Sequence, residues 1–166
     1  MSNIYTISDT HFNHKNIIDY CNRPFKSVTE MDNTIIQNWN NTVTNEDIII
    51  HCGDFVLGTS DEIRSYAKQL NGKKILILGN HDRKGKGFFE SCGFQVIKGI
   101  YSLAIEKDGV IQKYAFSHAP IEHFLPDDVI NIFGHIHNYP LNDRFNKANH
   151  KCVSVECIDY TPMKLT

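Results

Sequence analysis

The first half of the chain alternates short apolar runs with longer stretches whose apolar residues recur at helical spacing. Three runs have the length of buried strands, at residues 3–7, 47–50 and 74–78. The stretches between them predict helices over 27–41 and 59–70, and Ser27 with Glu30 forms a capping box at the start of the first helix. Such an alternation of strands and helices is typical of an α/β fold.

Strand signals predominate after residue 93. We expect strands at 94–98, 101–106, 110–116, 129–133 and 153–157. Asp108-Gly109 lies between the second and third of these runs and is a strong hairpin signal. A short helix near 88–92 precedes this section. We therefore expect an α/β protein whose sheets are mixed rather than purely parallel.

Length and composition narrow the class of protein. The chain has 166 residues without a visible linker or repeat, so we expect a single domain over 1–166. A net charge of −2 gives no global attraction to nucleic acid or to an anionic membrane. No apolar run is long enough to span a membrane, and the first residues lack the pattern of a secretion signal. The five cysteines include no CxxC pair, which favours reduced thiols and a cytoplasmic location.

Polar residues follow five of the predicted strands at the point where each strand ends. The runs ending at 7, 50, 78, 116 and 133 are followed by SDTH, HCGD, GNHD, SH and GHIH. These segments contain seven candidate metal ligands: Asp9, His11, Asp54, Asn80, His118, His135 and His137. Ligand sites in open α/β sheets form at the carboxyl ends of strands, so we expect the five segments to converge.

The chemistry of this set suits divalent metal ions. Imidazole nitrogens, carboxylates and one amide oxygen, without a thiolate, are typical ligands of Mn, Fe or Zn. Seven ligands are too many for one tetrahedral ion but enough for two ions that share a carboxylate. In Asp9-x-His11 and His135-x-His137, alternate residues project to one side if the backbone is extended. A glycine that lets the backbone turn or come close precedes three of the ligands: Gly53, Gly79 and Gly134.

Each fragment alone is weak evidence, because an isolated Asp-x-His pair or Gly-Asp turn is common as plain structure. Their conjunction in this order, each after an apolar run, points to a metal site. Four of the nine histidines lie elsewhere: His14, His51, His123 and His150. We expect His51 to be packed in a strand and His123 and His150 to lie in exposed or polar segments. His14 either lines the site or begins a helix.

Together the motifs resemble the full motif set of calcineurin-like metallophosphoesterases. They are Asp9-x-His11, Gly53-Asp54, Gly79-Asn80-His81-Asp82, His118 and Gly134-His135-x-His137. They cover most of the chain, and the segments SDTHFNHKNII and GHIHN resemble in particular a small bacterial and phage group of that superfamily. The resemblance implies a four-layer α/β/β/α sandwich, with mixed sheets, flanking helices and a dinuclear site at one sheet edge.

The resemblance also implies a role for each residue. One metal would be held by Asp9, His11, Asp54 and His137, and the other by Asp54, Asn80, His118 and His135, with Asp54 bridging. His81 would be the catalytic histidine that faces the substrate phosphate without binding metal. Two divalent ions ~3.5–4 Å apart clamp an in-line displacement, and a water that bridges them supplies hydroxide near neutral pH. A cationic His81 would offset phosphoryl charge or protonate the leaving oxygen.

The sequence departs from one branch of that superfamily. In protein serine/threonine phosphatases, an aspartate and an arginine continue the Gly-Asp motif, whereas Leu57 and Gly58 stand here. This difference argues against a protein phosphatase and leaves His81 without that orienting aspartate. Asp82 is the nearest carboxylate in sequence. The candidate substrate-binding residues are Asn13, His14 and Arg23.

We therefore expect a metal-dependent phosphoric ester hydrolase, either a phosphodiesterase or a phosphatase. Its cofactors would be two divalent ions, with Mn first and Fe, Zn, Ni, Co or Mg as alternatives. The short chain leaves no room for a large cap, which favours small or nucleotide-like phosphate mono- or diesters. Two alternatives stay open: a nuclease acting on DNA or RNA, and a non-catalytic metal-binding interaction module. The nuclease alternative is supported only by short basic clusters such as Arg83-Lys84. Nothing in the sequence specifies the oligomeric state.

Overall fold

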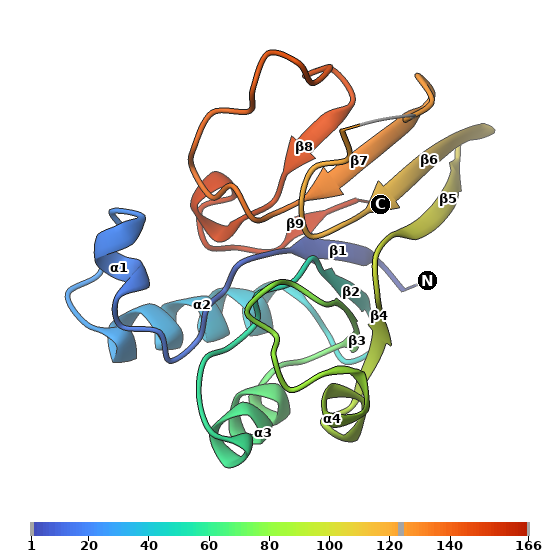
Figure 1. Ribbon diagram of the computed structural model, residues 1–166. Coiled ribbons are helices and arrows are strands. Elements are labelled where there is room, and N and C mark those ends of the chain that lie inside the picture. The colour runs from blue at the N-terminus through green and yellow to red at the C-terminus, as the bar shows by residue number, and fades with distance from the viewer. Residues whose placement is uncertain (1, 123–124, 166) are drawn as a thin grey trace.

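Two β-sheets packed face to face form the centre of the molecule (Figure 1). The computed structural model describes residues 2–122 and 125–165, so His123 lies outside the described residues. The first sheet has the order β4-β3-β2-β1-β9 and consists of Phe94–Ile97, Lys73–Ile77, Ile48–His51, Ile4–Ile7 and Met163–Lys164. Its first four strands are parallel, and β9 runs antiparallel to β1.

The second sheet is mixed and has the order β5-β6-β7-β8. Its strands are Tyr101–Lys107, Val110–Phe116, Val129–Phe133 and His150–Cys152. The predicted hairpin at Asp108-Gly109 joins β5 to β6 in antiparallel register, while β6, β7 and β8 are parallel. The mixed sheets of an α/β fold are therefore confirmed.

The helices are α1 (Ile17–Tyr20), α2 (Val28–Thr42), α3 (Ser60–Gln69) and α4 (Lys86–Ser91). In Figure 1, α2, α3 and α4 lie against the first sheet, on the face turned away from the second, and α1 lies to one side. Ser27 caps α2 by accepting a hydrogen bond from the backbone N–H of Glu30. Thr59 caps α3 in a complete capping box with Glu62.

Two separate cores explain why the strands of the first sheet read as continuous apolar runs. Successive side chains point to opposite faces of a strand, so Ile49 packs under the helices and Ile50 packs between the sheets. Leu76 and Ile77 divide in the same way. A sheet that is buried on both faces needs apolar residues at every position.

Two expectations differ from the structure. The fourth layer is missing: within 2–122 and 125–165, no α-helix follows α4, and the outer face of the second sheet carries none. Alternate residues of β5 are exposed accordingly. The run 153–157 is also not a strand, because β8 ends at Cys152 and Val155–Cys157 forms a 3₁₀ helix.

The state of the cysteines and the length of the helices bear on two further expectations. All five cysteines are free. None of the helices among the described residues has the length and apolar character needed to cross a membrane.

The carboxyl ends of the strands meet at one edge where the two sheets touch. Ser8, directly after β1, donates its N–H to the carbonyl of Val153 and forms a bridge with Ser154. Gly134, directly after β7, donates to the carbonyl of His118. The first of these bonds joins the two sheets, and the second joins two loops of the second sheet that bear predicted ligands.

Candidate metal centre

The ligand-bearing loops have an unusual backbone. Asp9, His11, Asp54, His135 and His137 all lie in the left-handed region, with φ angles of 54°, 47°, 57°, 69° and 51°. The extended backbone expected for the two x-spaced pairs is therefore wrong, although both pairs still converge. Left-handed backbone is unfavourable for residues other than glycine and tends to occur at functional sites.

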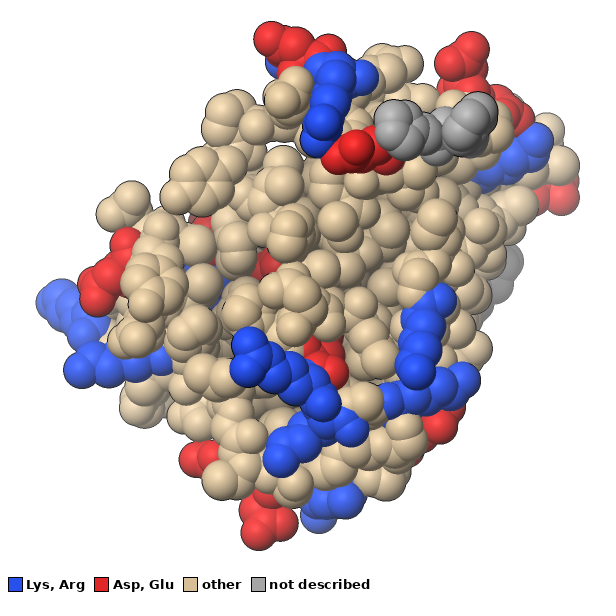
Figure 2. Space-filling view, viewed as in Figure 1, with Lys and Arg blue, Asp and Glu red and all other residues tan. Residues whose placement is uncertain are grey.

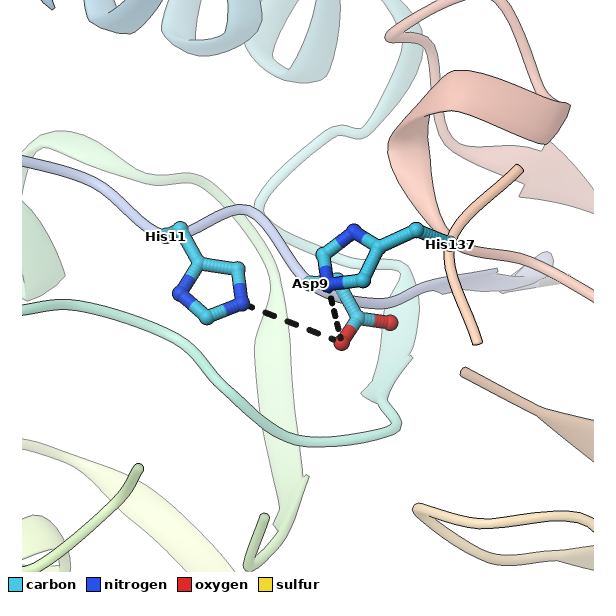
Figure 3. Close-up of side chains that lie close together, drawn as sticks. All are labelled: Asp9, His11 and His137. Atoms are coloured by element: carbon cyan, nitrogen blue, oxygen red, sulfur yellow. Dashed lines mark ion pairs between the residues drawn. The ribbon is translucent and has the colours of Figure 1, made fainter. Parts of the chain in front are cut away.

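The first cluster joins Asp9, His11 and His137 (Figure 3). The Oδ1 atom of Asp9 lies 4.0 Å from His11 Nε2 and 3.9 Å from His137 Nε2. Asp9 Oδ1 and His11 Nε2 are both buried and have no hydrogen-bond partner. The other oxygen of Asp9 is held by the backbone N–H of His135 at 2.9 Å and by Ser154 Oγ at 2.8 Å. One carboxylate oxygen is thus fixed by the protein and the other faces two imidazole nitrogens.

Asp54 lies between this cluster and a second one. Its Oδ2 atom is 3.6 Å from His11 Nε2 and 3.5 Å from His118 Nε2, so one oxygen faces ligands of both clusters. Its Oδ1 atom accepts the backbone N–H of His81 at 2.8 Å. Burial opposes ionisation of Asp54, but the hydrogen bond and positive charge of His118 keep its pKa below the usual value.

The second cluster consists of Asn80, His118 and His135. Asn80 Oδ1 lies 2.8 Å from His118 Nε2 and 3.1 Å from His135 Nδ1. His118 Nδ1 lies 2.8 Å from the carbonyl oxygen of Cys52, which can only accept, so Nδ1 carries a hydrogen. The lone pair of a neutral His118 ring is then on Nε2, which faces the Asn80 oxygen. Acceptor atoms that converge in this way require a cation or an added proton between them.

The residues therefore fit a pair of divalent ions. Without metal, the ring of His118 holds the added proton: burial lowers its pKa, but Asp54 and Asp9 more than reverse this and raise it to about 9. Burial raises the pKa of Asp9 and lowers that of His11 to about 2. A metal ion would satisfy the unpartnered atoms of both residues and displace the proton from His118.

Hydrogen bonds of Asp82 hold the loops in place, and two glycines allow the loops to pack closely. The Asp82 carboxylate accepts the backbone N–H groups of Asp54, Phe55 and Gly79 at 2.8, 3.0 and 2.8 Å. Its bonds fasten the loop after β2 to the loop after β3, and no described bond joins it to the ring of His81. A Cβ atom at Gly79 would overlap the Asp54 carboxylate, and one at Gly134 would overlap Asp9 Oδ2 and Ser8 Oγ. The close backbone approach expected at these glycines is confirmed.

Sequence reasoning missed Ser154 and Glu156, which touch the candidate ligands Asp9 and His137. Glu156 Oε1 lies 3.0 Å from His137 Nδ1. Both residues follow β8, so they occupy the same position after a strand as the predicted ligands. The incorrect strand over 153–157 concealed this signal, because it placed both residues inside a strand.

A cavity of about 290 Å³ opens onto the two clusters. It is lined by His11, His14, Ile17, Tyr20, Cys21, Asp54, Asn80, His81, His135, His137 and Tyr139. His14 therefore lines the site, with Nδ1 3.5 Å from His11 Nδ1. His81 is exposed here, and its ring centre is 5.4 Å from that of His11.

The other two predicted substrate contacts lie outside this cavity. The side chain of Asn13 donates to the carbonyl of Leu57, and Asn13 lines a different cavity between α2 and α3. Arg23 is buried, and its guanidinium donates to the carbonyl oxygens of Asp9 and Thr10. Arg23 thus lies beneath the site rather than facing a phosphate. The expectation for His51 holds, because it is buried in β2 beside Thr10, whereas His150 lies in β8 rather than in a loop.

Comparisons with known proteins identify the family and the fold. The family model for calcineurin-like phosphoesterases matches residues 2–158. An uncharacterized protein of Methanocaldococcus jannaschii, MJ1445, is 40% identical over 174 residues, which cover 99% of this chain and 88% of that protein. The crystal structure of AQ665, a protein of unknown function from Aquifex aeolicus, superposes with a TM-score of 0.71 and 27% identity, over 99% of this chain and 96% of that one. Nuclease MPE of Pseudomonas putida shares the fold, with a TM-score of 0.51 and 19% identity over 81% and 61% of the two chains.

Proposed function

Since the chain belongs to the calcineurin-like phosphoesterase family, we propose that it uses two divalent metal ions to hydrolyse small, nucleotide-like phosphate esters. The observation that carries the proposal is the pair of buried, unpartnered atoms Asp9 Oδ1 and His11 Nε2. Leaving such atoms unpaired is costly, so a protein that keeps them beside an open cavity supports a role in binding a cation. Mn is the first candidate, because the donors are nitrogen and oxygen atoms.

Two groups of residues would hold the ions. Asp9, His11, Asp54 and His137 would hold one, and Asp54, Asn80, His118 and His135 the other. When bound, such ions supply Lewis-acid polarisation of the phosphoryl group and lower the pKa of a bound water. The chain supplies the fixed arrangement of these donors, since Asp82 and the close-packed glycines hold the loops.

His81 is the proposed catalytic histidine. Its backbone is anchored to Asp54, while its side chain is exposed in the cavity and takes no part in either ligand cluster. A protonated ring in this position would face the phosphoryl oxygens and give its proton to the leaving oxygen. General acid catalysis of this kind contributes roughly 10²–10⁴-fold.

The shape of the site favours a small substrate. A second cavity, of about 310 Å³, shares His135 with the first, so the two adjoin at the second cluster. Ile136, Pro140, Leu141 and Phe145 give it an apolar wall, and the ion pair of Arg144 with Glu122 also lines it. A substrate whose phosphate lies at the ligands would have room there for a flat or apolar leaving group. This arrangement supports phosphodiesters such as cyclic nucleotides over phosphomonoesters with a small leaving group.

A nuclease activity is the second candidate. Figure 2 shows Lys and Arg side chains gathered over the loop between β3 and α4. Arg83, Lys84 and Lys86 are exposed there, directly after the loop that bears Asn80 and His81. Such a cluster beside the site favours a polyanion, and binding would then weaken steeply with salt.

The test is a panel of phosphomonoesters, linear and cyclic diesters, nucleotides and single-stranded DNA, each with Mn, Ni, Zn and Mg. We expect two equivalents of bound metal and turnover of diesters. A chain that binds metal but turns over no ester would support the interaction-module alternative. Cleavage of DNA in preference to small diesters would favour the nuclease.

His81→Ala tests the proposed catalytic role. We expect turnover to fall by roughly 10²–10⁴-fold while both metals stay bound, because His81 lies outside the ligand clusters. Metal content and activity are measured on the same sample. A loss of metal in step with activity would make His81 a ligand instead.

A further inference from the structure

Three side chains from distant parts of the chain meet beneath the ligand His137. Arg23 follows α1, His137 follows β7 and Glu156 lies in the 3₁₀ helix after β8. Glu156 Oε1 is 2.8 Å from Arg23 Nε and 2.7 Å from Arg23 Nη2. The same oxygen is 3.0 Å from His137 Nδ1. Arg23 and Glu156 are almost fully enclosed, with 0% and 4% of their side chains exposed.

The contact with Glu156 determines which nitrogen of His137 can bind a metal. An ionised carboxylate can only accept hydrogen bonds, so Nδ1 of His137 must carry the hydrogen between them. The lone pair of the neutral ring is then on Nε2. That atom lies 3.9 Å from Asp9 Oδ1, on the side of the first cluster. Partners of this kind fix the tautomer and the orientation of a metal-binding histidine.

Arg23 connects this pair to the opposite side of the cluster. Its Nη2 donates to the carbonyl of Asp9 at 2.7 Å, and its Nη1 donates to the carbonyl of Thr10 at 3.0 Å. One guanidinium therefore fixes both the carboxylate that orients His137 and the backbone that carries Asp9. Its positive charge also offsets the buried charge of Glu156.

We propose that Glu156 is a positioning residue for metal binding at the first cluster. We also propose that Arg23 holds Glu156 and the backbone of Asp9 in fixed positions relative to each other. The proposal rests on the proposed metal-dependent function. It also replaces the direct contact between Arg23 and phosphate with an indirect role. A competing arrangement exists, because donor atoms of Cys21, His137 and Glu156 lie within 4.8 Å of one another. A metal bound to His137 Nδ1 in such a site would displace the hydrogen that faces Glu156 Oε1. Its oxygen ligand would be Glu156 Oε2, which is buried and has no hydrogen-bond partner.

Metal titration of Glu156→Gln is the main test. We expect one of two Mn sites to weaken by about 10- to 100-fold, while the site formed by Asn80, His118 and His135 keeps its affinity. The matched control is Asp128→Asn, which removes a carboxylate paired with Lys113 on the surface and should leave both affinities unchanged. Wild-type affinity at both sites of Glu156→Gln would overturn the proposal. If the wild type binds no divalent metal, the proposed function itself fails.

A second variant distinguishes two roles of Glu156: positioning His137 and neutralising the buried charge of Arg23. Glu156→Gln leaves Arg23 unpaired and could unfold the chain for that reason alone. The double variant Arg23→Gln/Glu156→Gln removes both charges, and we expect it to keep the weak first site. Recovery of wild-type metal affinity in the double variant would mean that Glu156 only neutralises Arg23, which would overturn the proposal.

Two spectroscopic measurements on the wild type decide the matter, and variants serve only to assign the signals. In the zinc-loaded protein, NMR of the histidine rings should show His137 protonated at Nδ1, with the signal assigned by its loss in His137→Asn. Protonation at Nε2 would overturn the proposal. The cobalt-loaded protein should show no thiolate-to-cobalt absorption, because Cys21 is not a ligand. Such a band, lost in Cys21→Ser, would establish the competing site and overturn the proposal.

Discussion

Asp9 and Asp47 lie at opposite ends of the same pair of parallel strands. They differ in how fully their carboxylates are hydrogen-bonded and in the direction of their pKa shifts. Asp47 precedes β2, and its carboxylate accepts hydrogen bonds from the backbone and side chains of both Asn3 and Thr44. These hydrogen bonds lower the pKa of Asp47 to about 2, and those from Thr44 have the largest effect. Asp9 follows β1, has one oxygen without any partner, and has its pKa raised by burial.

The difference shows what each end of the sheet is built for. Asp47 is stabilised as an anion by the protein alone, so its end of the sheet is complete without a ligand. Asp9 sits on left-handed backbone with an unsatisfied oxygen, so its end stores unfavourable free energy. A bound cation would release that cost, which is why function is expected at this end and stability at the other.

The strongest test of this comparison is Asp9→Asn. We expect activity and affinity at the first cluster to fall by more than about 100-fold, because even the outer partners of metal ligands are worth 10–100-fold. The free energy of unfolding of the metal-free protein should stay the same or increase, since a buried charge is removed. Mn titration, activity and urea unfolding with EDTA measure the three quantities. A large loss of stability in the metal-free variant would contradict the comparison.

Metal addition should stabilise the folded chain through the Asp9 end alone. At a free Mn concentration of about 100 times the dissociation constant, we expect each occupied site to add about 2.7 kcal/mol to the free energy of unfolding. Urea unfolding with and without Mn measures this gain. It should persist in Asp47→Asn and shrink in Asp9→Asn. An equal gain in both variants would show that the ion binds elsewhere.

The candidate ligands could be singled out from sequence because each follows an apolar run, and their role in metal binding stays a prediction. Asp54 and Asn80 come directly after buried strands, and the parallel order of those strands brings their carboxyl ends together. Spacing identified these residues without any knowledge of side-chain conformation. The same logic failed for Glu156, because the strand before it was misplaced by a few residues.

Other features could not be read from sequence because they depend on contacts between distant segments. Arg23 and Glu156 are 133 residues apart, and nothing local in either segment indicates that they pair. The left-handed backbone of His11 and His137 is likewise imposed by the surrounding structure, since only a few per cent of residues other than glycine adopt it. The missing fourth layer shows the limit of resemblance: a shared motif set implied helices that this chain does not form after α4 in its described part.

Asp82 combines features of Asp9 and Asp47. It lies at the same end of the sheet as Asp9, but both of its oxygens are hydrogen-bonded, as those of Asp47 are. In Asp82→Asn, at least one of the N–H groups of Asp54, Phe55 and Gly79 must face the new amide NH₂ group. We expect the free energy of unfolding to fall by about 1–3 kcal/mol, which is the usual cost of a buried donor without a partner. Urea unfolding of the metal-free protein measures this change. No loss of stability would mean that Asp82 does not hold the loops together.

The smallest expected effect is the contribution of Asp47 to the pH dependence of the free energy of unfolding. The pKa of Asp47 is about 2 in the folded chain, below its ordinary value of 3.8, so its contribution to stability is fully present above about pH 4 and is lost as the pH falls toward 2. Asp47→Asn removes that contribution at every pH. The gap in unfolding free energy between wild type and variant should therefore be widest at neutral pH and close toward pH 2. Urea unfolding of the metal-free proteins across this range measures the gap. A gap that stays constant down to pH 2 would mean that the hydrogen bonds of Asn3 and Thr44 do not favour the charged form, and the contrast with Asp9 would then lose its physical basis.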